Sequence, residues 1–193
     1  MGIANSLRRA RRRSGASLRS IASRAGVGAG NLSAIENGRR DPTTSTVDKL
    51  ASAIGVEWVP ILTEGRSSAV RAAEEIAGWE AQGLPDRAYR RFIQLADDLA
   101  TADAVTRVLL AVEEPDDSHP RWVDAIAALL EVRLREASAP LPAWVTERRG
   151  HPDVVWEPQR SVYPLPVSAD LADVAPEFLR RGIAIERGEL ASA

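Results

Sequence analysis

Small apolar side chains recur every three or four residues in the first sixty positions, which is the spacing of amphipathic helices. The clearest stripe consists of Val47, Leu50, Ala51 and Ile54. Shorter stripes lie in residues 17–26 and 30–38, on either side of a glycine-rich turn. The pattern therefore predicts several short helices packed around a small core.

Residues with helix-capping chemistry stand at the predicted helix ends. Ser17 and Thr43 each precede an apolar stripe, where a side-chain hydroxyl can accept a hydrogen bond from a backbone N–H. Gly28 occupies the N-cap position of the segment after the turn. Gly38 and Gly55 lie where helices commonly end in a left-handed residue. These signals support the helical prediction for the first sixty residues.

Polar residues 64–68 form a short hinge, and we place a domain boundary there. Apolar stripes in residues 65–137 then predict four helices, with Thr101 as a cap of the third and Pro120 as the first residue of the fourth. Core packing explains each stripe, so we expect a small helical bundle. Part of its apolar surface is available for a dimer interface.

The last 56 residues have a different composition, because seven of the twelve prolines fall between residues 138 and 193. This density excludes long helices, while the interleaved Trp144, Trp156 and Tyr163 argue against plain disorder. We expect extended segments, a short helix from Pro176 to Gly182, and a strand at residues 183–185. Such an extension either lies over the bundle or wraps around a partner.

Charge is divided unevenly along the chain. Residues 1–60 contain ten basic and four acidic residues, for a net charge of +6, whereas the remainder carries −8. A basic head on an acidic body is typical of a nucleic-acid-binding protein with a second function in its other half. The alternative explanation is a solvated, arginine-rich helix.

Several classes of protein are disfavoured by what the sequence lacks. There is no cysteine, and therefore no disulfide or thiolate metal site. No apolar run is long enough for a secretory signal or a membrane span, so we expect a cytoplasmic protein without a membrane partner.

Catalytic chemistry also has little support. The two histidines, His119 and His151, each adjoin a proline, and Asp116 and Asp117 near His119 fit a solvated turn better than a metal site. The motifs of phosphate-binding loops, α/β-hydrolases, zinc proteases and dinucleotide-binding folds are absent. We expect no enzyme activity, no cofactor and no metal.

Residues 5–60 closely resemble the Cro/phage-repressor (XRE) family of helix-turn-helix domains. The residues that carry the resemblance are Leu7, Arg11, Gly15, Ser17, Ile21-Ala22, Gly26-Val27, Leu32-Ser33, Ile35-Glu36-Asn37-Gly38, Pro42, Thr46 and Leu50-Ala51. The resemblance implies a five-helix domain that inserts its third helix into the major groove of double-stranded DNA, usually as a homodimer. The expected fold class is then mainly α, with this repressor-like domain in residues 1–64, a bundle in 65–137 and a Pro-rich extension in 138–193.

The same resemblance assigns roles to individual residues. It implies a structural ion pair between Arg11 and Glu36, because a buried carboxylate without a cation is costly. The positions that reach base edges are Ala29, Gly30, Asn31, Ser33 and Ala34. Asn31 is the best candidate for direct readout, since its amide both donates and accepts. The positions expected to contact phosphates are Asn37, Arg39 and Arg40, with Arg19 as a further candidate.

Two departures bear on sequence specificity. Leu18 stands where the family often has a glutamine that binds a phosphate, and Ala29, Gly30 and Ala34 have almost no hydrogen-bonding capacity. Specificity then depends on DNA shape and dimer spacing, or on side chains not yet identified. The alternative is a protein-interaction module whose helix-turn-helix does not read DNA.

The C-terminal part faintly resembles actinobacterial antitoxin-like regulators. The resemblance is carried by the region around Trp144, the Pro-rich stretch and residues 176–190. It implies an autoregulating antitoxin that holds a toxin on residues 65–193. The expected function is therefore sequence-specific DNA binding by a transcriptional regulator, a repressor, with the antitoxin as its narrower form.

Overall fold

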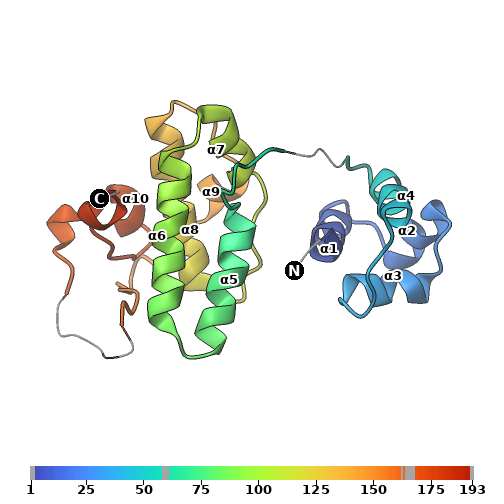
Figure 1. Ribbon diagram of the computed structural model, residues 1–193, viewed down its shortest axis with the longest axis horizontal. Helices are drawn as coiled ribbons and strands as arrows, with labels where there is room; N and C mark the ends of the chain where they lie inside the picture. The colour runs from blue at the N-terminus through green and yellow to red at the C-terminus, as the bar shows by residue number, and fades with distance from the viewer. Residues whose placement is uncertain (1–2, 58–60, 162, 164–167, 192–193) are drawn as a thin grey trace. The chain divides into compact units, whose positions relative to one another are not determined.

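The computed structural model describes residues 3–57, 61–161, 163 and 168–191. Its contacts divide the chain into two units, Met1–Leu62 and Thr63–Ala193. Ten α-helices and two short 3₁₀ helices form within the described residues, and no strand does (Figure 1). The expectation of a mainly α fold is confirmed.

The first unit consists of α1 (Ile3–Arg13), α2 (Leu18–Ala25), α3 (Ala29–Glu36) and α4 (Thr44–Ile54). The buried side chains that form its core are Leu7, Ile21, Ala22, Ala25, Leu32, Ile35, Leu50 and Ala51. All four helices contribute to this core, because each presents one apolar face to the others.

The described part of this unit has four helices, one fewer than the resemblance implied. Gly55 adopts a left-handed conformation (φ 88°) and ends α4. Residues 58–60 lie outside the described part of the chain, and the next helix begins at Ala69, within the second unit.

The predicted caps of the first unit are confirmed. The Ser17 side chain accepts a hydrogen bond from the Ser20 N–H, and Thr43 accepts one from the Thr46 N–H. Gly38 has a left-handed backbone with φ 67°. Local capping chemistry therefore sets the helix ends in this unit.

The second unit is built around one long helix. α8 (Pro120–Glu136) packs against α5 (Ala69–Ala81), α6 (Pro85–Ala100), α7 (Ala104–Ala111) and the short helices α9 (Ala143–Glu147) and α10 (Pro176–Leu179) (Figure 1). Pro120 is the first residue of α8, as predicted. The four predicted helices of the bundle are all present.

The cap of α7 differs from the prediction. Asp103 occupies the N-cap, where its side chain accepts hydrogen bonds from the Val105 and Thr106 N–H groups. A hydrogen bond from the Thr106 side chain is the main reason that the pKa of Asp103 lies below its ordinary value. Thr101 instead donates to the Asp97 carbonyl at 3.0 Å, at the end of α6. The expected role of Thr101 is therefore wrong, because α7 begins two residues later.

The Pro-rich extension lies over the bundle. It contains α9 (Ala143–Glu147), α10 (Pro176–Leu179) and the 3₁₀ helices η1 (Leu171–Asp173) and η2 (Arg187–Leu190). Its apolar residues that join the core of the bundle are Trp144, Val145, Val174, Ala175, Phe178, Ile183, Ile185 and Leu190. The ring of Phe178, for example, meets that of Phe92 edge-on, with centroids 6.5 Å apart.

The strand predicted at residues 183–185 does not form. Ile183 makes a single parallel bridge with Trp156, and Glu186 makes a single antiparallel bridge with Val174. Ile183 and Ile185 are fully buried against the bundle. The apolar run therefore packs on helices instead of pairing with a neighbouring strand.

No described helix is both long enough and apolar enough to cross a membrane.

Candidate nucleic-acid interface

The turn between α2 and α3 is made by Gly26, Val27 and Gly28. Gly26 ends α2 with a left-handed backbone (φ 64°), and the Val27 N–H donates to the Ala22 carbonyl at 2.9 Å. Gly28 then starts α3 from an extended conformation. Val27 also packs against the core, so the two helices are held at a fixed angle by a short, well-packed turn.

An ion pair anchors the last turn of α3. Arg11 Nε and Nη2 donate to Glu36 Oε1 and Oε2, both at 2.7 Å, and Arg11 Nη1 donates to the Ala16 carbonyl at 3.1 Å. Glu36 is only 4% exposed. The hydrogen bond to Glu36 raises the pKa of Arg11. Arg11 on α1 is thus bonded both to α3, through Glu36, and to the loop that precedes α2, through the Ala16 carbonyl.

The remaining sides of α3 are accessible. Its buried residues are Leu32, Ile35 and Glu36, whereas Gly30 is exposed. The partly exposed residues of the helix are Ala29, Asn31, Ser33 and Ala34. The structure thus leaves accessible all five residues to which the resemblance assigns base contacts.

The chain leaves α3 in a direction set by Gly38. The Gly38 N–H donates to the Ile35 carbonyl and the Arg39 N–H to the Ala34 carbonyl, both at 2.9 Å, while Gly38 is left-handed. Arg39 and Arg40 follow immediately, and both are exposed.

Three arginines near α2 and α3 keep their guanidinium groups available. Arg19, in the first turn of α2, is exposed, as are Arg39 and Arg40. Within the described residues, none of the three pairs with a carboxylate. Unpaired guanidinium groups beside an accessible helix are suited to phosphate oxygens.

Two asparagines have less freedom than the sequence suggests. Asn31 Oδ1 is buried and accepts no hydrogen bond from a described residue. Asn37 turns its amide back onto α3, where Nδ2 donates to the Ser33 carbonyl at 2.8 Å. Asn31 therefore has to use its amide NH₂ or rotate before it can read a base, and Asn37 is engaged in ending the helix.

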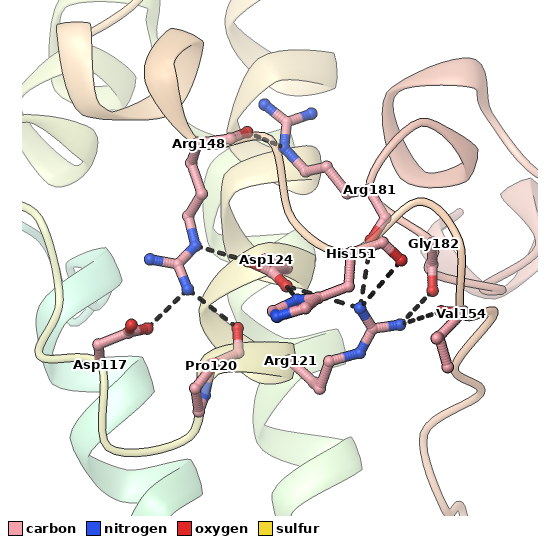
Figure 2. Close-up of polar contacts among 9 residues, drawn as sticks. All are labelled: Asp117, Pro120, Arg121, Asp124, Arg148, His151, Val154, Arg181 and Gly182. Carbon is pink, nitrogen blue, oxygen red and sulfur yellow. Dashed lines mark hydrogen bonds and ion pairs between the residues drawn. The ribbon is translucent and has the colours of Figure 1, made fainter.

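Sequence reasoning missed a polar cluster in the second unit (Figure 2). Asp124 is 1% exposed and accepts a hydrogen bond from Arg148 Nε at 2.6 Å, and His151 Nδ1 lies 3.0 Å from its other oxygen. Arg148 also donates to Asp117 at 2.6 Å, and Arg121 to the Val154 carbonyl at 2.7 Å. Burial lowers the pKa of Arg148, but the bonds to the two aspartates outweigh it and leave the pKa raised.

This cluster fastens the extension to α8 and resembles a structural brace more than a catalytic site. In the sequence, its one signal is a carboxylate at position 124 within an otherwise apolar stretch of α8. Among the described residues, no group of three His, Asp or Glu side chains is placed to hold a metal ion.

A family model described as a helix-turn-helix domain matches residues 3–59. No curated protein and no solved structure matches the chain. The matched range covers α1 to α4, and thus the turn, the ion pair and the exposed arginines described above. Residues 3–59 are therefore an XRE-like helix-turn-helix domain, and the match does not extend into the C-terminal region.

Proposed function

We propose that this protein is a sequence-specific transcriptional repressor that binds double-stranded DNA as a homodimer. The helix-turn-helix domain indicates DNA-binding transcriptional regulation. The observation that carries the proposal is the placement of α3: Glu36 anchors the helix to Arg11, and unpaired Arg39 and Arg40 follow its end.

In this proposal, phosphate contacts supply most of the affinity for DNA, and α3 contacts the bases in the major groove. Arg39 and Arg40 neutralise phosphates on the rim of the major groove while α3 lies within the groove. Arg19 at the start of α2 adds a further phosphate contact. Affinity then falls steeply with salt, because each neutralised phosphate releases counterions.

Direct base readout is limited to few side chains. Ser33 and the amide of Asn31 have hydrogen-bonding groups, whereas Ala29, Gly30 and Ala34 provide apolar contacts at most. Much of the specificity then arises from DNA shape and from the spacing of two half-sites about 34 Å apart. The dimer is proposed because the resemblance to the repressor family implies one, and each copy would then contact one half-site.

The test is selection of bound duplexes from a random DNA library with the full chain. We expect enrichment of a two-fold symmetric site. The double variant Arg39→Glu/Arg40→Glu is expected to lose this binding, because it reverses two phosphate-facing charges. The control Arg90→Glu/Arg187→Glu has the same change in net charge on exposed residues of the second unit and is expected to bind the selected site.

Two results would contradict the proposal. If no sequence is enriched, the chain does not read DNA and the protein-interaction module becomes the better explanation. If the Arg39/Arg40 variant binds as tightly as the control, α3 does not dock as described. The narrower antitoxin role requires a protein held on residues 65–193, so co-purification of a toxin encoded by a neighbouring gene tests it separately.

A further inference from the structure

Five arginines converge on one cavity in the second unit. The cavity has a volume of about 450 Å³, and α8, the segment after α9 and the end of α10 form its walls. The charged residues that line it are Arg135, Arg148, Arg149, Arg180, Arg181 and Glu131. Its volume falls within the range of small-ligand sites, about 300–1,000 Å³.

Two of these arginines are held rigidly by the protein. Arg181 is 1% exposed and donates to the carbonyls of Val145 and Arg148 at 2.7 and 3.0 Å. Arg148 in turn donates to Asp124 and Asp117 (Figure 2). These contacts explain both side chains as braces of the extension, and they also fix two positive charges at the cavity wall.

A single buried carboxylate, that of Glu131, forms ion pairs with three of the arginines. It lies 2.6 Å from Arg135 Nη2 and 2.8 Å from Arg181 Nη1, and it also contacts Arg180. Arg135 has Glu177 as a second partner. The pKa of Arg180 lies below its ordinary value because of burial and, next, the nearby charge of Arg181. Positive charge is therefore in excess around Glu131.

Arg149 adds to this excess. It is exposed and makes no ion pair with a described residue. Arg180 is 46% exposed and has no carboxylate of its own among the described residues, since it shares Glu131. Arg180 adds a third cation to a carboxylate that already pairs with Arg135 and Arg181, and Arg149 makes no contact with a described residue that braces the extension. Bracing therefore leaves the placement of Arg149 at the cavity unexplained.

We propose that this cavity binds a small molecule that carries a phosphate or diphosphate group. Guanidinium groups match phosphate oxygens with paired hydrogen bonds, and several of them around one point suit a compact, multiply charged anion. A duplex would instead require cations spread along a surface. The cavity lies within the second unit, so binding there does not require the helix-turn-helix domain to bind DNA.

The test is calorimetric titration of the full chain with inorganic pyrophosphate at about 0.15 M salt, where weak surface attraction is screened. We expect saturable binding with one site per chain. The double variant Arg149→Ala/Arg180→Ala removes the two exposed arginines of the cavity that have no carboxylate of their own among the described residues. It should weaken pyrophosphate binding by about tenfold or more. Arg90→Ala is the matched control, because Arg90 is exposed on α6 and pairs with no described carboxylate.

Further arms locate the binding and its chemistry. The Arg39→Glu/Arg40→Glu variant should bind pyrophosphate as the unaltered chain does, because its changes lie in the other unit. Malonate, a dicarboxylate, should bind more weakly than pyrophosphate. The proposal is overturned if pyrophosphate shows no saturable binding or if the Arg149/Arg180 variant binds it normally. It is also overturned if Arg90→Ala or the Arg39/Arg40 variant loses as much affinity for pyrophosphate as the Arg149/Arg180 variant does. Malonate binding as tight as that of pyrophosphate would overturn it as well.

Discussion

Arg11 and Glu36 lie 25 positions apart in the sequence and are joined by two parallel hydrogen bonds of 2.7 Å. Glu36 ends α3 and is 4% exposed, whereas the Arg11 side chain is 13% exposed and donates a further bond to the loop before α2. The guanidinium thus adds a polar anchor to the apolar packing of Leu32 and Ile35, which holds the helix proposed to enter the major groove. The asymmetry in burial leads to the first prediction.

Removal of Arg11 should cost more than removal of Glu36. Arg11→Ala leaves a buried carboxylate without a cation and should lower the free energy of unfolding of the first unit by about 3 kcal/mol. Glu36→Ala leaves a cation that can reach water, so its cost should be smaller. Hydrogen exchange of peptides from residues 3–57 measures both values. Arg12→Ala, at an exposed neighbour, is the control, and equal costs for Arg11→Ala and Glu36→Ala would contradict the explanation.

The two glycines of the turn should respond in opposite directions. Gly26 has φ 64°, and a Cβ added there would have no atom within 4 Å, so Gly26→Ala should destabilise through backbone strain alone, by about 1 kcal/mol. Gly28 has an ordinary φ of −62° and open space around it, and Gly28→Ser should stabilise α3 by a few tenths of a kcal/mol as a side-chain cap. Thermal unfolding of the two variants measures the signs, and stabilisation by Gly26→Ala would refute the assigned turn geometry.

The salt dependence of DNA binding should change in each single variant that removes a phosphate contact. If Arg40 neutralises one phosphate, Arg40→Ala should reduce the slope of log K against log salt concentration by about 0.9. Arg90→Ala, at an exposed position of α6, should leave the slope unchanged. Fluorescence anisotropy with the selected duplex over a range of salt concentrations gives both slopes. An unchanged slope for Arg40→Ala would remove Arg40 from the interface.

Gly182 should be the least replaceable glycine of the extension. A Cβ there would overlap the His151 carbonyl oxygen and lie 2.7 Å from that of Val154, and φ is 69°. Gly182→Ala should therefore release the extension from α8, with a loss of more than about 2 kcal/mol. Gly188→Ala is the matched control, because no atom lies within 4 Å of its Cβ position. Limited proteolysis after residue 143 compares the two, and equal resistance would argue against this packing.

Alkaline pH should weaken the contact between α6 and η2. Burial and the hydrogen bond that the Tyr89 hydroxyl donates to Glu189 raise the pKa of Tyr89 above its ordinary value. A raised folded-state pKa means that Tyr89 contributes its full stability below about pH 10, the unfolded value, and loses it as the pH rises toward the folded value. The free energy of unfolding should therefore fall with pH above this point, and Tyr89→Phe should flatten the fall. Tyr163→Phe, at a residue that is 80% exposed, should not.

Local features of the fold could be predicted from the sequence because their causes are local. Ser17, Thr43, Gly38 and Gly55 set helix ends through their own backbone and side-chain chemistry, and each stands where it was expected. The sequence predicts the wrong cap for α7, because Thr101 and Asp103 both have side chains that can cap a helix. The residue that caps it is Asp103, since α7 begins at Ala104.

The sequence by itself determined a mainly α chain and the positions of its principal helices, because period and caps act over a few residues. The helix-turn-helix domain was indicated by the family resemblance of residues 5–60. Tertiary structure alone decided that the apolar run at residues 183–185 packs on α8 and its neighbours instead of forming a strand. It also decided that Asp124 binds the extension and that arginines from three segments surround one cavity. Such side chains come into contact only when distant parts of the chain pack together, and the local spacing of apolar residues carries no information about those contacts.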